Sequence, residues 1–146
     1  MRRAATHIWR SWPPLVIIAA AIWYLFLFQP VVVVKTDVEV TDNRFVFNAY
    51  SHKTFLANTL CNKPSLAVLQ FEDSAQNVRN VADNAKGYGS GDAKIRHWKS
   101  TGTIPQGLLP GAVTVWKKLV YPCIFGTVRE VKTKPIPIIV KPHPGD

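Results

Sequence analysis

The chain of 146 residues carries 18 Lys and Arg against 9 Asp and Glu, which gives a formal net charge of +9. Its 11 prolines and 8 glycines are close to an average share, so the composition argues against wholesale disorder. About 110 residues remain beyond an apolar N-terminal run, enough for one small domain with its own core. The positive charge would attract anionic lipid or other polyanions, and a solvated basic surface is the alternative.

The N-terminal region is dominated by an uncharged run over residues 11–34, SWPPLVIIAAAIWYLFLFQPVVVV. A helix needs roughly 20 apolar residues to cross the hydrocarbon of a bilayer, so we predict a transmembrane helix over 11–34. Trp12 and Arg10 suit the membrane interface. Pro30 predicts a bend or the end of the helix. The lipid bilayer is therefore the first predicted partner.

Residues 1–10 form a basic head, in which Arg2, Arg3 and Arg10 have no acidic neighbour. The positive-inside rule places this head in the cytoplasm and the rest of the chain beyond the inner (plasma) membrane, in the periplasm or outside the cell. A signal peptide cleaved at 19–21 is the alternative. Such cleavage would leave an apolar, poorly soluble terminus, so we favour an uncleaved anchor.

Beyond residue 34, apolar residues recur with a period of two, which is typical of strands. Alternating apolar residues flank a turn cluster at 41–43 and predict a hairpin near 36–50. The β-branched residues at 31–34 also favour extended backbone. Residues 72–92 are polar and predict one or two helical turns followed by a flexible glycine-rich loop. Further strands are predicted at 66–71, 95–98, 112–121, 127–132 and 135–140.

About seven short strands separated by turn signals predict an antiparallel β-sandwich over residues 35–141, followed by a flexible tail at 142–146. In the clearest strand, 112–121, alternate apolar residues share one face and Lys117 interrupts it. The predicted fold class is thus a transmembrane helix followed by a mainly-β domain.

Cys61 and Cys123 both lie beyond the apolar run. An even pair in an oxidising compartment predicts a disulfide, which would close a loop of about 60 residues. Two free buried thiols are the alternative.

The triplet Tyr121-Pro122-Cys123 resembles the tyrosine corner of immunoglobulin-like sandwiches, where a tyrosine two residues before the second cysteine bonds to backbone. The resemblance implies an immunoglobulin-like strand arrangement, with Cys61 and Cys123 bridging the two sheets and Tyr121 as the corner residue. An ordinary core tyrosine is the alternative.

The stretch 104–123 joins a Pro-Gly turn, a strand and a Tyr-x-Cys triplet, behind a short N-terminal anchor. This layout is similar to that of small membrane-anchored β-domain proteins of tailed bacteriophages. The resemblance implies an envelope or lysis accessory role and supplies no catalytic residue.

Candidate catalytic groups are few. His52 or His97 with Cys61 as nucleophile would need a thiolate beside an oriented imidazole, which a disulfide forbids. Adjacent carboxylates at 72–73 are typical of a solvated turn, and the glycine-rich stretch 87–91 lacks the Lys-Ser/Thr of a phosphate loop. The metal-binding spacings HExxH and CxxC do not occur. We therefore predict no enzyme activity, no cofactor and no metal site.

Two short segments interleave aromatic and cationic residues, a pattern that on an exported domain suits lipid headgroups or cell-wall polymer. We expect no nucleic-acid partner. Packing of both tryptophans into the sandwich, with the cations in solvent, is the alternative. Together with Arg10 and Trp12, the predicted membrane-interface or partner-binding residues are Trp98, Lys99, Trp116, Lys117 and Lys118.

The sequence therefore predicts a single-pass, inner-membrane-anchored, non-enzymatic interaction module. It would display a small β-sandwich in the periplasm and hold an unidentified envelope or membrane-protein partner. The alternative is a small subunit of a membrane complex, whose anchor helix makes the main contacts through the small residues at 19–21. An enzyme with His52 or His97 beside a carboxylate is a third hypothesis.

Overall fold

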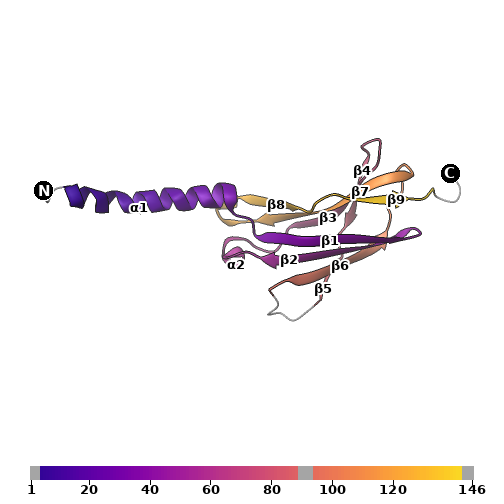
Figure 1. Ribbon diagram of the computed structural model, residues 1–146, viewed down its shortest axis with the longest axis horizontal. Coiled ribbons are helices and arrows are strands. Elements are labelled where there is room, and N and C mark those ends of the chain that lie inside the picture. The colour runs from indigo at the N-terminus through magenta and orange to yellow at the C-terminus, as the bar shows by residue number, and fades with distance from the viewer. Residues whose placement is uncertain (1–3, 89–93, 143–146) are drawn as a thin grey trace.

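The computed structural model describes residues 4–88 and 94–142, with side chains from residue 12 onward. Two antiparallel sheets form the body, and a helix projects from one end (Figure 1). One sheet has the strand order β1-β2-β6-β5, and the other has β4-β3-β7-β8, with β9 paired to the first half of β7. The strands are β1 (Val31–Thr41), β2 (Arg44–Lys53), β3 (Leu66–Glu72), β4 (Val78–Ala82), β5 (Lys86–Tyr88), β6 (Arg96–Thr103), β7 (Gly111–Pro122), β8 (Val128–Lys132) and β9 (Ile136–Val140).

Most predicted strands are confirmed. β1 and β2 form the hairpin expected near 36–50, and Asp42 takes a φ of 54° in its tight turn, which aspartate tolerates better than most residues. The strands expected at 66–71, 95–98, 112–121, 127–132 and 135–140 correspond to β3, β6, β7, β8 and β9.

The helical turns predicted within 72–92 are wrong, since β4 and β5 lie there and bring the described strands to nine rather than about seven. β4 is an edge strand that pairs with β3 alone, and nearly all of its residues are exposed. Only Val81 of this strand packs against the core, so its sequence shows no regular alternation. Most of the predicted glycine-rich loop and of the predicted tail lies outside the described residues.

The N-terminal helix, α1 (Ala4–Ile22), passes into one π-helical turn, η1 (Trp23–Leu27). Figure 1 shows α1 as an indigo rod that extends away from the end of the sandwich where α2 (Ala57–Leu60) lies. A 3₁₀ turn, η2 (Ile124–Gly126), joins β7 to β8 near the same end.

The predicted transmembrane helix over 11–34 is wrong. Within the described residues, no helix is long and apolar enough to cross a membrane. Helical backbone ends before Phe28, whose conformation is extended, and the valines from Val31 onward belong to β1, where they pair with β2. The apolar run is therefore divided between helix and sheet, because Pro30 removes a helical donor and β-branched valines favour strands.

The apolar core fills the half of the sandwich that is remote from α1. Phe45 and Phe47 of β2 face Leu69 and Phe71 of β3, and the rings of Phe45 and Phe71 lie 5.2 Å apart. The strand β7 adds Val113 and Val115, and β9 closes this half with Ile138 and Val140. All of these side chains are at most 8% exposed, so the two sheets are held together here by close apolar packing.

A buried ion pair replaces apolar packing in the middle of the sandwich. Lys117 of β7 lies 2.5 Å from the carboxylate of Asp83, and their side chains are 7% and 3% exposed. Asp83 also accepts a hydrogen bond from the hydroxyl of Ser100 on β6. Because β6 and β7 belong to different sheets, this group links the sheets. The residue that interrupts the apolar face of β7 is thus an inward-facing lysine with its own counter-ion.

Replacing Lys117 by methionine should lower the free energy of unfolding by about 3–5 kcal/mol, because it leaves the Asp83 carboxylate buried without its cation. Lys118→Met is the matched control: Lys118 faces outward and pairs with the 43%-exposed Glu130 side chain at 3.4 Å, so its loss should cost at most about 1 kcal/mol. Urea unfolding of both variants measures the difference. Equal losses would show that the pair does not stabilise the fold.

A second carboxylate organises the turn between β3 and β4. Asp73 accepts hydrogen bonds from the backbone N–H groups of Leu109, Ala75 and Asn77, at 2.9–3.0 Å, and from the Asn77 side chain at 2.9 Å. These bonds lower the pKa of Asp73 from 3.8 to about 2, and the bond from the Leu109 N–H has the largest effect. The ionised form thereby ties this turn to the loop before β7.

This depressed pKa predicts a specific acid sensitivity. Stability from ionised Asp73 is fully present above pH 3.8 and is lost as the pH falls towards about 2. The melting temperature of the wild type should therefore exceed that of Asp73→Asn at neutral pH, and the gap should shrink over this window. Asp42→Asn, at the exposed tip of the first hairpin, is the control. A gap that stays constant down to pH 2 would contradict the prediction.

Candidate functional site

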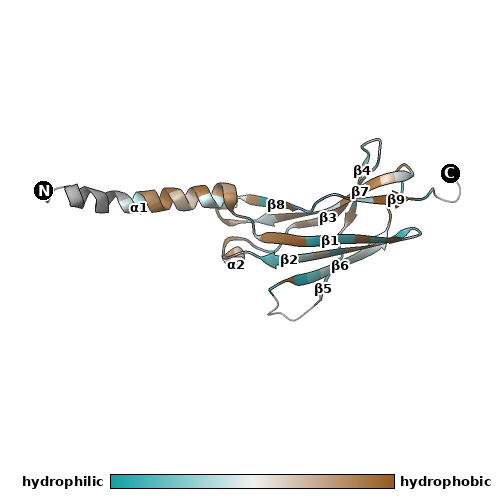
Figure 2. Ribbon diagram, viewed as in Figure 1, coloured by the Kyte–Doolittle hydropathy of each residue, from teal (hydrophilic) through white to brown (hydrophobic). Residues whose placement is uncertain are grey.

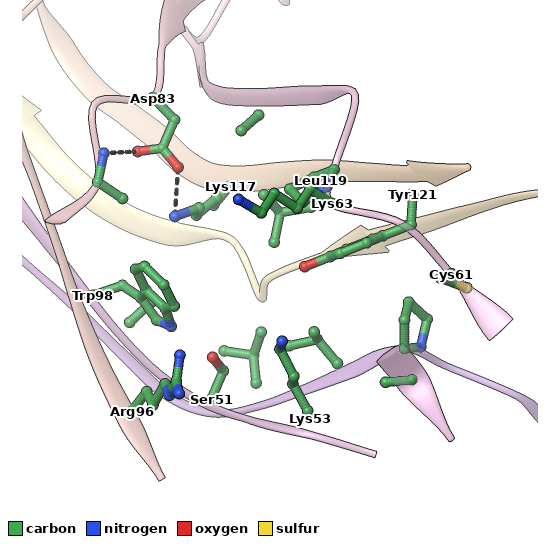
Figure 3. A pocket seen from close by; sticks show the side chains of 18 of the residues that line it. Ser51, Lys53, Cys61, Lys63, Asp83, Arg96, Trp98, Lys117, Leu119 and Tyr121 are labelled. Carbon is green, nitrogen blue, oxygen red and sulfur yellow. Dashed lines mark hydrogen bonds and ion pairs between the residues drawn. The ribbon is translucent and has the colours of Figure 1, made fainter. Parts of the chain in front are cut away.

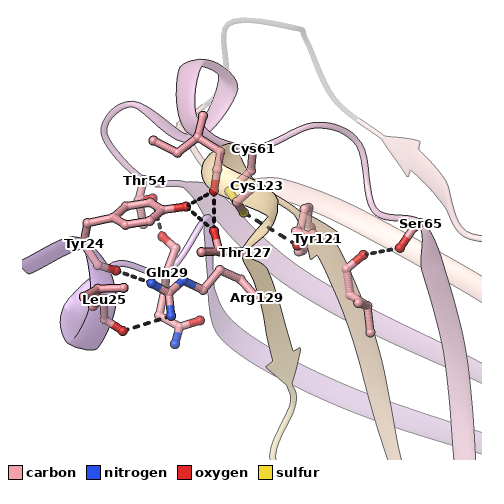
Figure 4. Close-up of a disulfide and its surroundings, with 12 residues drawn as sticks. Tyr24, Leu25, Gln29, Thr54, Cys61, Ser65, Tyr121, Cys123, Thr127 and Arg129 are labelled. Atoms are coloured by element: carbon pink, nitrogen blue, oxygen red, sulfur yellow. Dashed lines mark hydrogen bonds between the residues drawn. A yellow bond between two sulfur atoms is a disulfide. The ribbon is translucent and has the colours of Figure 1, made fainter. Parts of the chain in front are cut away.

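The helix is joined to the sandwich by two aromatic side chains. Tyr24 and Phe28 are 9% and 2% exposed, and the centres of their stacked rings lie 5.6 Å apart. Both pack in one apolar cluster with Cys61 of the Cys61–Cys123 disulfide, and Figure 4 shows Tyr24 at the end of the sandwich that holds this disulfide. The hydroxyls of Tyr24 and Thr127 share a hydrogen bond of 2.6 Å. The residues that end the helix are thus part of a small apolar cluster of the sandwich, which fixes the direction in which α1 projects.

Arg129 of β8 completes this joint. Its guanidinium donates to the carbonyl oxygens of Leu25, at 3.0 Å, and Tyr24, and it lies 5.0 Å from the centre of the Tyr24 ring. The last carbonyls of a helix lack backbone partners and carry partial negative charge, so a cation suits this position. Thr54, just after β2, donates to the carbonyls of Gln29 and Pro30 and holds the segment that follows.

The predicted disulfide between Cys61 and Cys123 is confirmed. The two cysteines are backbone partners at the end of β7, and the next residue, Asn62, donates to the Pro122 carbonyl at 2.9 Å. The bond therefore closes one end of the sandwich. The resemblance to immunoglobulin-like domains implied a bond between the centres of the two sheets, and that implication is wrong. Its 62-residue separation corresponds to roughly 4 kcal/mol of unfolded-state restriction.

The described side chains of α1, those from residue 12 onward, are exposed on every side. Leu15, Val16, Ile17 and Ile18 are consecutive, and each is 54–69% exposed. Because successive helical residues point about 100° apart, these four point in all directions around the axis. Figure 2 shows brown, hydrophobic colour over the middle of α1, with pale and teal bands towards both ends of its coloured part.

Apolar side chains also surround the base of α1. Phe55 and Phe125 are 80% and 91% exposed. Phe55 follows Thr54, which bonds to the segment just after the helix, and Phe125 follows Ile124, whose carbonyl accepts from Tyr24. Phe125 has a φ of 57° and Leu56 a φ of 63°, a conformation that costs free energy in residues of this size. We call Phe55, Leu56, Phe125 and Val128 the apolar rim.

A cavity of about 730 Å³ lies between the sheets, in the half nearest α1. The inward side chains of β2 run from Phe45 and Phe47 to Ala49 and Ser51, so the filling becomes smaller towards this end. The inward side chains of β3 become smaller in the same direction, from Phe71 through Leu69 to Ala67. The cavity is thus the space that small residues leave beyond the core.

The walls of the cavity combine apolar and polar side chains (Figure 3). Lys117 and Asp83 lie at its inner side, where they are buried, whereas Lys53, Asn58 and Lys63 are exposed and mark its mouth. The apolar lining includes Val31, Val33, Ala49, Ala67, Trp98 and Leu119.

The structure disperses the predicted interface residues. Neighbouring residues of a strand point to opposite faces, so Trp98 and Lys117 face the cavity while Lys99, Trp116 and Lys118 point outward. The Trp116 indole donates to Gln70 at 2.8 Å. Trp12 is exposed on α1, and the side chain of Arg10 lies outside the described residues. The predicted interface residues whose side chains are described form no single surface.

Tyr121, predicted as a corner residue, ends β7 with its half-buried ring in the cavity wall. Burial raises the pKa of its hydroxyl, which therefore stays protonated at neutral pH. The corner role and the immunoglobulin-like resemblance remain predictions. Sequence reasoning missed Ser51, Lys53, Asp83 and Arg129; only the decreasing size of alternate residues along 45–51 hinted at a cavity.

Among the described residues there is no group of three or more His, Cys, Asp or Glu side chains placed to hold a metal ion. No protein-family model matches this chain, and a comparison with curated protein sequences gives no match. Function therefore has to be argued from the rod, its rim and the cavity.

Removing the Arg129 cation should loosen the joint. In Arg129→Met the carbonyls of Tyr24 and Leu25 lose their donor, so the backbone amides of residues 23–28 should exchange hydrogen about tenfold faster. Arg44→Met, at the exposed start of β2, is the control and should leave these rates unchanged. Hydrogen–deuterium exchange with mass spectrometry measures both. Unchanged exchange at 23–28 in Arg129→Met would show that other contacts hold the helix.

Proposed function

We propose that this protein is a non-enzymatic interaction module that α1 attaches to a lipid surface, with the sandwich held beside that surface. The observation that carries the proposal is the all-round exposure of apolar side chains along α1. Burying each such side chain is worth on the order of 1.5–3 kcal/mol, so a rod of this kind is expected to be covered.

Lipid fits this rod better than a partner groove does. A groove covers one face of a helix, whereas acyl chains surround it. From Leu15 to Ile22 no side chain carries a polar atom, so the rod has no hydrogen bond to offer a specific partner. The proposed contact is with the apolar layer of the lipid and is not a crossing of it.

The apolar rim also supports lipid as the material that covers α1. Phe55 and Phe125 lie at the base of the rod, where a surface that covers α1 would reach the sandwich. Phenylalanine side chains of peripheral proteins bury their rings in the boundary between headgroups and acyl chains. The net charge of +9 adds attraction to anionic headgroups.

The disulfide supports the proposal that the sandwich lies in an oxidising compartment. Disulfides persist where the environment is oxidising, so we place this part of the protein on the periplasmic or extracellular side of the inner membrane. There, the joint around Tyr24 and Arg129 would present the sandwich to an envelope partner in a fixed orientation.

Flotation with vesicles of phosphatidylethanolamine and phosphatidylglycerol tests the lipid contact. The full chain, diluted from mild detergent, should float with the vesicles. The variant Leu15→Gln/Ile17→Gln/Ile18→Gln should lose most of this binding, and Phe55→Ser/Phe125→Ser should weaken it about tenfold, as expected from losing buried apolar area.

The matched control is Val78→Gln/Leu109→Gln/Ile139→Gln, which removes three exposed apolar side chains from the part of the sandwich remote from α1. It should float like the wild type. Full-chain protein that stays in the lipid-free fraction, or a control that loses as much binding as the α1 variant, would overturn the proposal. Recovery of the full chain as a defined oligomer without lipid would point to a protein partner instead.

A further inference from the structure

The cavity between the sheets shows signs of a binding site. At about 730 Å³ it falls within the range of small-molecule sites, which are mostly apolar with a few polar groups. Closely packed interiors rarely leave such a volume, and its apolar walls would gain by being covered. It is also separate from the outward surfaces of α1 and the rim.

Two hydroxyl groups in its walls point to a polar ligand atom. Figure 3 shows the hydroxyls of Ser51 and Tyr121 directed into the cavity from opposite sheets. Ser51 is only 7% exposed. Within the described residues neither hydroxyl is bonded to another protein group, and neither is among the buried polar atoms left without a partner, so both are open to the cavity. Both can donate to a bound acceptor.

The charge of the lining indicates the sign of the ligand. Lys117 is neutralised by Asp83, which is the only acid among the lining residues that the structure describes. Lys53 and Lys63 at the mouth have no carboxylate partner in the described chain, and Lys53 donates only to the Asn58 side chain, at 2.7 Å. Two uncompensated cations beside hydroxyl donors favour an anionic group.

We propose that this cavity binds a small amphipathic anion, a single apolar chain ending in a carboxylate. The carboxylate would lie near the mouth, within reach of Lys53, Lys63 and the Tyr121 hydroxyl. The apolar chain would lie inward, between the apolar walls of the two sheets around Ala49 and Leu119. Charge-assisted hydrogen bonds fix the head, and burial of the chain supplies most of the affinity.

Photolabelling locates such a ligand and separates it from lipid contact. The probe is decanoic acid with a diazirine near the end of its chain, added below micellar concentration to the full chain in an uncharged detergent. We expect cross-links in peptides that cover β2 and β7. Unlabelled decanoate should compete at least tenfold better than decanol, which has the same tail without the charge.

The variant Lys53→Gln/Lys63→Gln should lower decanoate affinity about tenfold and leave decanol competition unchanged. Both lysines are exposed, so the fold should survive. Lys134→Gln/Lys141→Gln changes the charge equally, away from the cavity, and should bind like the wild type. Cross-links confined to residues 4–27, equal competition by decanol, or equal losses in both lysine variants would overturn the proposal. Failure of vesicle flotation alone would not affect it.

Discussion

The ion pair between Lys117 and Asp83 divides the interior of this protein into one half that is closely packed and one half that contains a cavity. On one side, phenylalanine and branched aliphatic side chains bring the sheets together. On the other, the inward residues of β2 and β3 are alanine and serine, and the space between the sheets stays open. A pair buried in this position has to be satisfied, and Ser100 and Ala85 supply the remaining hydrogen bonds to Asp83. The pair therefore ends the core and forms the inner wall of the cavity at once.

The joint between helix and sandwich depends on how the apolar run divides. Tyr24 and Phe28 face the sandwich, whereas Leu15 to Ile18 have no part of the sandwich to cover them. The same hydrophobic composition therefore serves two purposes along one segment. Where it contacts the disulfide it fixes the base of α1, and beyond that point it remains an exposed apolar surface. Arg129 separates the two uses, because it holds the carbonyls at which the helix ends.

Much of the sheet structure could be predicted, because alternation and turn residues are local signals. The hairpin of β1 and β2 and the strand β7 follow directly from them. The extent of the helix could not, because composition does not reveal that Val31 and Val33 pair with β2 residues 18 or more positions later. β4 escaped prediction because an edge strand with only Val81 against the core shows no apolar period.

The candidate site was harder to predict than the fold. Lys117 was visible as an interruption in an apolar face, but its counter-ion lies in a polar segment 34 positions earlier, and no local pattern links them. The disulfide could be inferred from an even number of cysteines in a predicted oxidising compartment. Its position at the end of β7 could not, because it depends on which backbone segments pair. A cavity is defined by side chains that are absent, so it appears only once both sheets are placed.

The mouth of the cavity and the base of the rod lie at the same end of the sandwich. The exposed lining residues Asn58, Asn62 and Lys63 belong to the segment from α2 to β3, which carries Cys61 of the disulfide beside Tyr24 and Phe28. Figure 1 places α2 at the end from which α1 extends. Single-chain carboxylates partition into lipid surfaces, because each buried methylene is worth about 0.8 kcal/mol. A sandwich attached by α1 would therefore hold its cavity next to the phase in which such ligands are concentrated.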